Sequence, residues 1–97
     1  MLLALQNAFY RLLHSPTLEE GIVDTVMCGG DTDTTGAIAG ALLGAVHGCA
    51  AVPERWVRCL LSCRPLPGTP TAHPRSVEYW PVDALELAEA LLCVGRL

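Results

Sequence analysis

Residues 29–48 read GGDTDTTGAIAGALLGAVHG, a glycine pair and an acidic, hydroxyl-rich turn followed by a long run of small apolar residues. Two carboxylates, Asp31 and Asp33, are two positions apart. In an extended loop, alternate side chains point the same way, so both could converge on one ion. Thr34 or Thr35 can add a hydroxyl oxygen. Donors that are all oxygen suit Mg²⁺, Mn²⁺ or Ca²⁺ better than zinc, which favours His and Cys.

The apolar run predicts a helix from Thr34 to about Ala50. Glycines recur in it every four residues, which lets a neighbouring helix approach its backbone closely: Gly36, Gly40, Gly44 and Gly48. We therefore expect a central, tightly packed helix of an all-α core. The unpaired N–H groups at its start attract anions such as phosphates, while the carboxylates hold a cation. A metal-assisted site for a phosphate-bearing substrate is physically coherent there.

The segments before this region also have helical patterns. Apolar residues recur at near 3.6 spacing over residues 2–14, and Ser15 with Pro16 would end that helix. Thr17 with Glu20 is a capping-box signature that opens a second helix toward residue 26. A short strand over 21–27 is the one alternative.

After the glycine-rich helix, Pro53 suits the first position of a further helix. A proline-rich stretch without periodicity, 65–81, predicts an extended connection. A last helix follows from Val82. We expect all 97 residues to belong to one helical domain, with 65–81 as a connection within it.

The composition limits the possible partners. The chain has 97 residues, of which 52% are apolar and 16% charged, which is unusual for a small fold with much surface to cover. It indicates a piece buried in a larger body, or a chain that self-associates. The net charge is −4 and no lysine is present, so nothing favours binding to a nucleic-acid backbone.

Cysteine usage and the apolar runs bear on location. Five cysteines are scattered without a CxxC pair, which is typical of reduced thiols in a cytoplasmic protein. The run from Ala37 to Val52 contains His47 and is shorter than the ~20 residues of a membrane span, so no membrane insertion is expected. The N-terminus lacks the basic start and cleavage site of a signal peptide.

Other motifs that resemble the acidic turn fit less well. An EF-hand loop starting at Asp31 would need an acidic ligand where Leu42 stands. A phosphatase DxDxT motif needs a hydrophobic strand before its first Asp, where this chain has two glycines. That family also needs a lysine, and this chain has none. A P-loop would need GK[ST]. Simple helix capping by Asp31 and Asp33 stays open as the alternative to a metal site.

The segment VDTVMCGGDTDTTGAIAGALLGAVHG, residues 23–48, resembles the C-terminal signature of the ADP-ribosylglycohydrolase family. The resemblance continues more weakly through QNAFYRLLH upstream and through VPERW and WPVDALELAEALL downstream. It implies an all-α fold, here the C-terminal part of a many-helix bundle with a central Gly/Ala-rich helix. It also implies two divalent cations, Mg²⁺ or Mn²⁺. By this resemblance Asp31, Asp33 and Thr34 are metal ligands, and Gly29 and Gly30 lie close to ADP-ribose.

The activity implied by the resemblance is hydrolysis at the anomeric carbon of a ribose, releasing ADP-ribose from modified proteins or small molecules. Family members are much longer and supply further ligands from an N-terminal acidic cluster. The acidic residues of this chain before Gly29 are only Glu19, Glu20 and Asp24, which lie on a predicted helix and do not form such a cluster. Two hypotheses follow: a hydrolase fragment that contributes the C-terminal half of a divalent-cation site, or an inactive remnant or helical interaction module.

Overall fold

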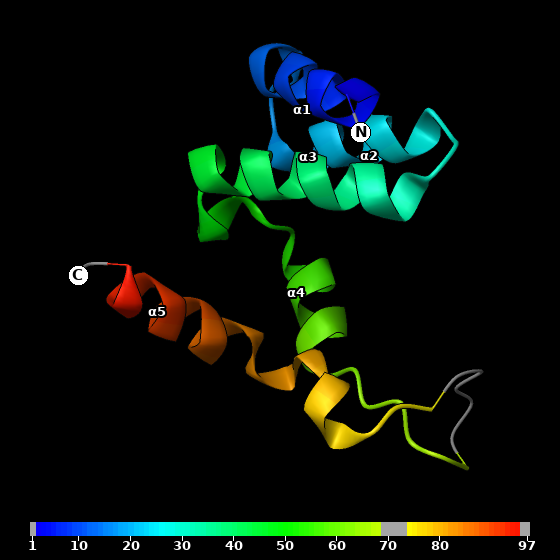
Figure 1. The fold of residues 1–97 in the computed structure, drawn as a ribbon, viewed down its shortest axis with the longest axis vertical. Helices are drawn as coiled ribbons and strands as arrows, with labels where there is room; N and C mark the ends of the chain where they lie inside the picture. The colour runs from blue at the N-terminus through cyan, green and yellow to red at the C-terminus, as the bar shows by residue number, and fades with distance from the viewer. Residues whose placement is uncertain (1, 69–73, 96–97) are drawn as a thin grey trace. The chain divides into compact units, whose positions relative to one another are not determined.

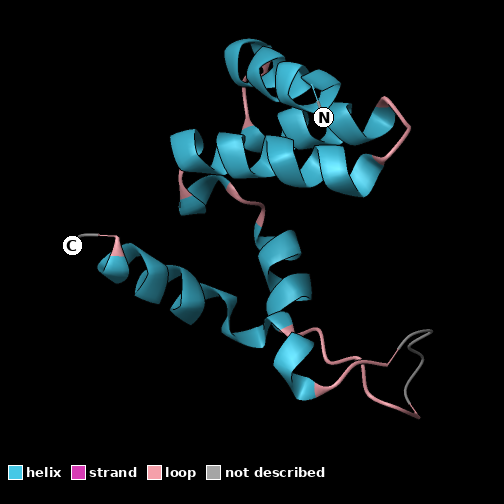
Figure 2. Cartoon of the chain, in the orientation of Figure 1, coloured by secondary structure: helices cyan, strands magenta, loops and turns pink. Residues whose placement is uncertain are grey.

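The structure, a computed structural model, describes residues 2–68 and 74–95, and the described chain is helical without any strand (Figures 1 and 2). The α-helices are α1 (Leu2–His14), α2 (Leu18–Met27), α3 (Thr32–His47), α4 (Glu54–Leu61) and α5 (Ala84–Val94). Short 3₁₀ turns cover Cys49–Ala51, Val77–Tyr79 and Pro81–Asp83. The predicted all-α class is confirmed. The chain forms two compact units, Met1–Pro53 and Glu54–Leu97.

The first two helices begin and end for the reasons that the sequence indicated. α1 ends at His14, immediately before Ser15 and Pro16. Thr17 has an extended backbone (φ −134°, ψ 159°), and its hydroxyl accepts a hydrogen bond of 3.1 Å from the Glu20 amide. This bond satisfies one of the amides that a helix start leaves unpaired, so Thr17 is the N-cap of α2. Residues 21–27 are therefore helical.

The boundaries of the later helices differ from those predicted. α3 begins at Thr32, two residues before Thr34, and its α-helical part ends at His47. Gly48 ends it because its φ of +86° lies outside the helical region. The residues expected to continue this helix form the 3₁₀ turn Cys49–Ala51. Similarly, Pro81–Asp83 forms a 3₁₀ turn, so α5 starts at Ala84.

The core of the first unit is built around α3, which contacts both α1 and α2 much more extensively than those two contact each other. Figure 1 shows the three helices together. The buried apolar residues are few and mostly small: Ala4, Ala8, Leu18, Ala39 and Leu43. A Cβ atom added at Gly36 would lie 3.5 Å from Val26, and one at Gly40 would lie 3.5 Å from Ile22. Two of the four predicted glycines thus do face a neighbouring helix closely.

The tightest contact in this unit is at Gly21 of α2. A Cβ atom there would lie 2.7 Å from Cδ1 of Leu43 and 3.3 Å from Ser15. Leu43 is fully buried, so it has little room to move away. Gly21 is therefore required by space, and it allows α2 to pack directly onto α3.

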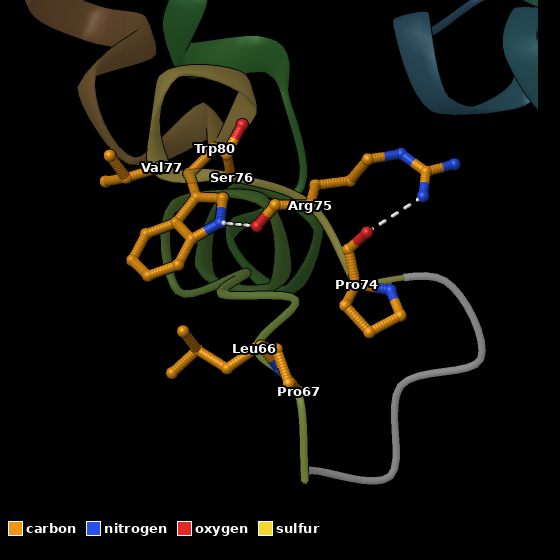
Figure 3. Close-up of a pocket in the computed structure, with 7 residues that line it drawn as sticks. All are labelled: Leu66, Pro67, Pro74, Arg75, Ser76, Val77 and Trp80. Atoms are coloured by element: carbon orange, nitrogen blue, oxygen red, sulfur yellow. Dashed lines mark hydrogen bonds between the residues drawn. The ribbon is translucent and has the colours of Figure 1, made fainter.

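The second unit has a different character, since none of its described residues is buried. α4 and α5 both contact the 3₁₀ turn Pro81–Asp83. A pocket of about 430 Å³ lies beside Trp80, whose indole N–H donates a 3.0 Å hydrogen bond to the carbonyl of Arg75 (Figure 3). Of the predicted connection 65–81, residues 69–73 lie outside the described part. No helix that the structure describes is long and apolar enough to cross a membrane.

The contact at Gly21 gives a prediction that contrasts two glycine-to-alanine changes. Alanine is the better helix former by about 0.5–1 kcal/mol. At Gly44 nothing lies within 4 Å of an added Cβ, so Gly44→Ala should raise the free energy of unfolding by about that amount. Gly21→Ala must displace Leu43, and overpacking costs about 1–3 kcal/mol, so it should lower the free energy of unfolding. Urea unfolding followed by circular dichroism measures both, and equal stabilisation by the two changes would contradict the packing at Gly21.

Candidate metal centre

The connection between α2 and α3 depends on two successive glycines. Gly29 has a φ of +79° and Gly30 a φ of +77°, in the region that side chains with a Cβ rarely adopt. Nothing lies within 4 Å of a Cβ added at either position. Glycine is thus required here by backbone conformation, and the space in front of both residues is open.

The three predicted metal ligands lie together at the start of α3. Asp31 is the N-cap, with φ −79° and ψ 73°, and Asp33 and Thr34 belong to the first turn. The expectation of an extended loop is therefore wrong, because the helix begins at Thr32. The side chains nevertheless come together: those of Thr34 and Asp33 lie close enough to the Asp31 carboxyl to lower its pKa.

The electrostatics of Asp31 reflect this grouping. Hydrogen bonding by the Thr34 side chain, and next by the Asp33 side chain, holds the pKa of Asp31 below its ordinary value of 3.8. The Thr34 amide contributes least, in keeping with the lack of a capping hydrogen bond from the Asp31 side chain. Asp31 thus occupies the capping position while its carboxylate interacts mainly with neighbouring side chains.

Thr35, the alternative hydroxyl donor, is already used within the helix. Its hydroxyl donates a 3.0 Å hydrogen bond to the backbone carbonyl of Asp31. This contact holds the Thr35 side chain against the helix backbone. Thr34, whose side chain is directed toward the Asp31 carboxyl, is the better placed of the two threonines to act as a ligand.

The candidate ligands lie on the solvent side of α3. Asp31, Asp33 and Thr34 are exposed. Positions four apart share a helix face, and the face of Asp33 continues as three exposed alanines: Ala37, Ala41 and Ala45. The buried residues of α3, Ala39 and Leu43, lie on a different side. The first unit therefore presents these oxygen atoms outward, away from its own core.

These residues fit part of a hard-cation site. Two carboxylates and one hydroxyl are the kind of ligand that Mg²⁺ and Mn²⁺ prefer. The described residues contain no group of three or more His, Cys, Asp or Glu side chains placed to hold a metal. Three side-chain donors are fewer than octahedral coordination requires, so other groups would have to complete the coordination.

A buried polar network lies behind the glycine loop, and sequence reasoning missed it. Thr25 of α2 is only 2% exposed. Its hydroxyl accepts a 2.9 Å hydrogen bond from the Asn7 amide of α1 and donates one of 2.8 Å to the carbonyl of Gly21. Asn7 and Thr25 line a pocket of about 270 Å³ that also reaches Gly29 and Thr35.

Arg11 extends this network to the end of α2. Its guanidinium donates hydrogen bonds to the Asn7 side chain at 3.3 Å and to Sγ of Cys28, the residue before Gly29, at 3.4 Å. It also lies 3.9 Å from a carboxylate oxygen of Asp24. Asn7 and Arg11 are four residues apart and so share a helix face with Ala4 and Ala8. Polar residues on an alanine-lined inner face were the signal that could have revealed the network.

The fold and this site define an all-α protein with an oxygen-rich candidate cation site at a helix start. The sequence profile of the ADP-ribosylglycohydrolase family matches residues 1–92, so the chain belongs to that family.

Curated relatives match shorter segments. The chain is 38% identical over 53 residues to the ADP-ribosyl-[dinitrogen reductase] glycohydrolase of Rhodospirillum rubrum, covering 55% of the chain and 18% of the relative. It is 45% identical over 40 residues to the ADP-ribosylhydrolase ARH3 of Bos taurus, covering 41% of the chain and 11% of the relative. An uncharacterized protein of Archaeoglobus fulgidus is 42% identical over 53 residues, which are 55% of the chain and 17% of the relative. The chain thus spans less than a fifth of the length of each of these relatives. The search of solved structures found no significant match.

The pKa of Asp31 gives a prediction about Thr34. In the native chain Asp31 should titrate below 3.8. Because its folded pKa is lowered, its carboxylate stabilises the fold above the unfolded pKa, and this stabilisation is lost as the pH falls through the folded pKa. Thr34→Val removes the hydroxyl and should move the Asp31 titration upward, whereas Thr34→Ser should keep it low. Carbon-detected NMR titration measures the midpoint, and no upward shift in Thr34→Val would contradict the contact.

The buried hydroxyl of Thr25 gives a second prediction. Thr25→Val keeps the shape but leaves the Asn7 amide without this partner, which should lower the free energy of unfolding by about 1–3 kcal/mol. Thr25→Ser keeps the hydroxyl and loses only a methyl group, at about 1 kcal/mol. Thermal and urea unfolding compare the two variants. A Thr25→Val variant as stable as the native chain would show that the network contributes little.

Proposed function

We propose that this chain contributes part of the active site of a metal-dependent hydrolase that removes ADP-ribose from modified proteins or small molecules. The observation that supports this most directly is the grouping of Asp31, Asp33 and Thr34 at the exposed start of α3, within the residues that match the family. Helix capping alone does not require this grouping, because the Asp31 side chain makes no capping hydrogen bond.

In this proposal Asp31, Asp33 and Thr34 hold Mg²⁺ or Mn²⁺, with two ions in the complete site. The two carboxylates supply negative charge, and Thr34 adds a neutral oxygen and lowers the pKa of Asp31. A divalent cation bound there would polarise substrate oxygens and position water. Any further acidic ligands would come from outside the described residues, since no third acidic side chain of that part joins the group.

Gly29 and Gly30 are proposed to lie against ADP-ribose. The open space in front of both residues supports this role, because no side chain prevents a ligand from approaching the backbone. The pyrophosphate is negatively charged, and the positive end of the helix dipole at the start of α3 favours such a group. The glycines thus bind and orient the substrate beside the carboxylates.

The reaction consumes one water molecule. The bond between the anomeric carbon of the ribose and its acceptor breaks, the water oxygen joins that carbon, and a proton passes to the leaving acceptor atom. The carboxylates of Asp31 and Asp33 would hold the cation beside the reacting ribose. The contacts to the pyrophosphate fix the position of the ribose relative to these carboxylates. The proposed partners are therefore ADP-ribosylated substrates, and we expect no binding to nucleic acid. The proposed location is the cytoplasm.

A second candidate is an interaction module without catalysis of its own. The many exposed large apolar side chains favour it, among them Leu2, Leu3, Leu13 and Met27, each at least 77% exposed. The two candidates differ in whether the acidic turn binds a metal ion, which can be measured directly.

The metal ligands can be tested by titrating the full chain with Mn²⁺, using calorimetry and the electron paramagnetic resonance of the free ion. Asp33→Asn keeps the shape and removes the charge, and it should weaken Mn²⁺ binding by at least roughly tenfold, as even outer-shell partners of a metal do. Glu20→Gln is the matched control, because it removes an exposed carboxylate of the same unit away from the turn.

Activity is then assayed as release of ADP-ribose from ADP-ribosylated protein in millimolar Mg²⁺, which Asp33→Ala should abolish. Absence of Mn²⁺ binding, together with no thermal stabilisation by Mg²⁺, would contradict the metal-site proposal. Binding without hydrolysis by the chain alone agrees with a partial site.

A further inference from the structure

The large apolar side chains of α1 point away from the core of the first unit. Toward α3 the helix presents Ala4 and Ala8, which are 7% and 0% exposed. On another side it carries four large residues at positions that share one helix face, here called the outer stripe: Leu2, Leu5, Phe9 and Leu13. Their exposed fractions are 79%, 48%, 49% and 77%.

This distribution is the reverse of that in a surface helix. A helix at the surface of a finished domain turns its large apolar residues toward the core and its polar residues toward water. In α1 the inner face holds alanines, Asn7 and Arg11, and the outer stripe holds three of the five leucines of the helix and the only phenylalanine of the chain. A contiguous stripe of this kind marks a surface that another element covers.

The family match indicates what that element is. The outer stripe lies within residues 1–92, so α1 is part of the family domain and not an addition to it. The matched segments make up only 11–18% of the three relatives, so more than four fifths of each relative lies outside the match. A complete family member therefore has ample further chain to cover α1.

A second copy of this chain fits the stripe less well. α1 has 13 residues, and a helix of that length is about 20 Å long and about 10 Å wide. Two such stripes packed on each other fall short of the roughly 1,200–2,000 Å² that a stable, specific interface buries.

We propose that the outer stripe of α1 is a docking surface for apolar helices from the remainder of an ADP-ribosylglycohydrolase domain. This rests on the proposed function in one respect: the same remainder would bring the ligands that the acidic turn lacks. The contact itself is apolar and independent of metal.

The test uses the full chain together with the Rhodospirillum rubrum relative from which the whole region corresponding to residues 1–92 of this chain, including the counterpart of α1, has been removed. Mixed in EDTA, the two should form a 1:1 complex, measured by size-exclusion chromatography with light scattering. Phe9→Gln combined with Leu13→Gln should weaken this complex at least tenfold. Tyr10→Gln is the matched control: it removes an aromatic ring of nearly the same exposure, 53%, from the next position of α1, and should change affinity less than twofold.

A chimera gives a second measurement that does not depend on the truncated partner folding. The region of the relative that corresponds to residues 1–92 is replaced by those residues of this chain, and Phe9→Gln should then lower the Tm by roughly 5 °C, while Tyr10→Gln should shift it by less than about 1 °C. Equal effects of Phe9→Gln and Tyr10→Gln in both formats would overturn the proposal. So would a homodimer of the chain that Phe9→Gln with Leu13→Gln dissociates, because the occupant would then be a second copy. Because the complex is measured in EDTA, failure of metal binding leaves this result unaffected.

Discussion

The close approach of α2 to α3 is the constraint on which the first unit depends. It requires the absence of a side chain at Gly21, where Leu43 lies closer than a Cβ would allow, while Gly36 and Gly40 of α3 face Val26 and Ile22 of α2 at ordinary contact distance. Small residues let the two helix backbones approach closely. Dispersion contacts between the backbones then provide the packing that large side chains provide in other cores. This contact aligns the end of α2 with the start of α3. The glycine loop can then be short, and its two positive φ angles turn the chain directly into the acidic turn.

The polar network around Thr25 makes the same placement more specific. Thr25 bonds to α1 and to its own helix, and Arg11 contacts Cys28 directly before the glycine pair. Apolar packing between small residues is tolerant of sliding, whereas buried hydrogen bonds lose much of their energy when partners shift. The network therefore fixes the position along the helix at which the loop begins.

Much of this arrangement could be predicted from the sequence, and the failures have identifiable physical causes. The start and end of α1 and the cap at Thr17 follow from local rules, because the stop signals and the capping hydroxyl act on their own neighbours. The pattern predicts the start of α3 two residues late, at Thr34, because it assigns Asp33 to an extended loop, although Asp also suits a first helical turn. The three predicted ligands do lie close together, but at a helix start instead of along an extended chain. The partners of Thr25 could not be predicted, because Asn7 is 18 positions away and only the packing of α1 brings it there.

The distribution of side-chain size connects the fold to its function. The interior of the first unit is filled by alanine, glycine and two leucines, while large apolar residues and the three candidate ligands face outward. In a self-sufficient domain this arrangement would be unfavourable, because apolar area stays in water. This cost disappears if another body covers α1, since it would bury the exposed leucines. Under the two proposals, the same body also faces the start of α3 and adds ligands to the candidate ones there, so the first unit would be a part of a larger helical domain.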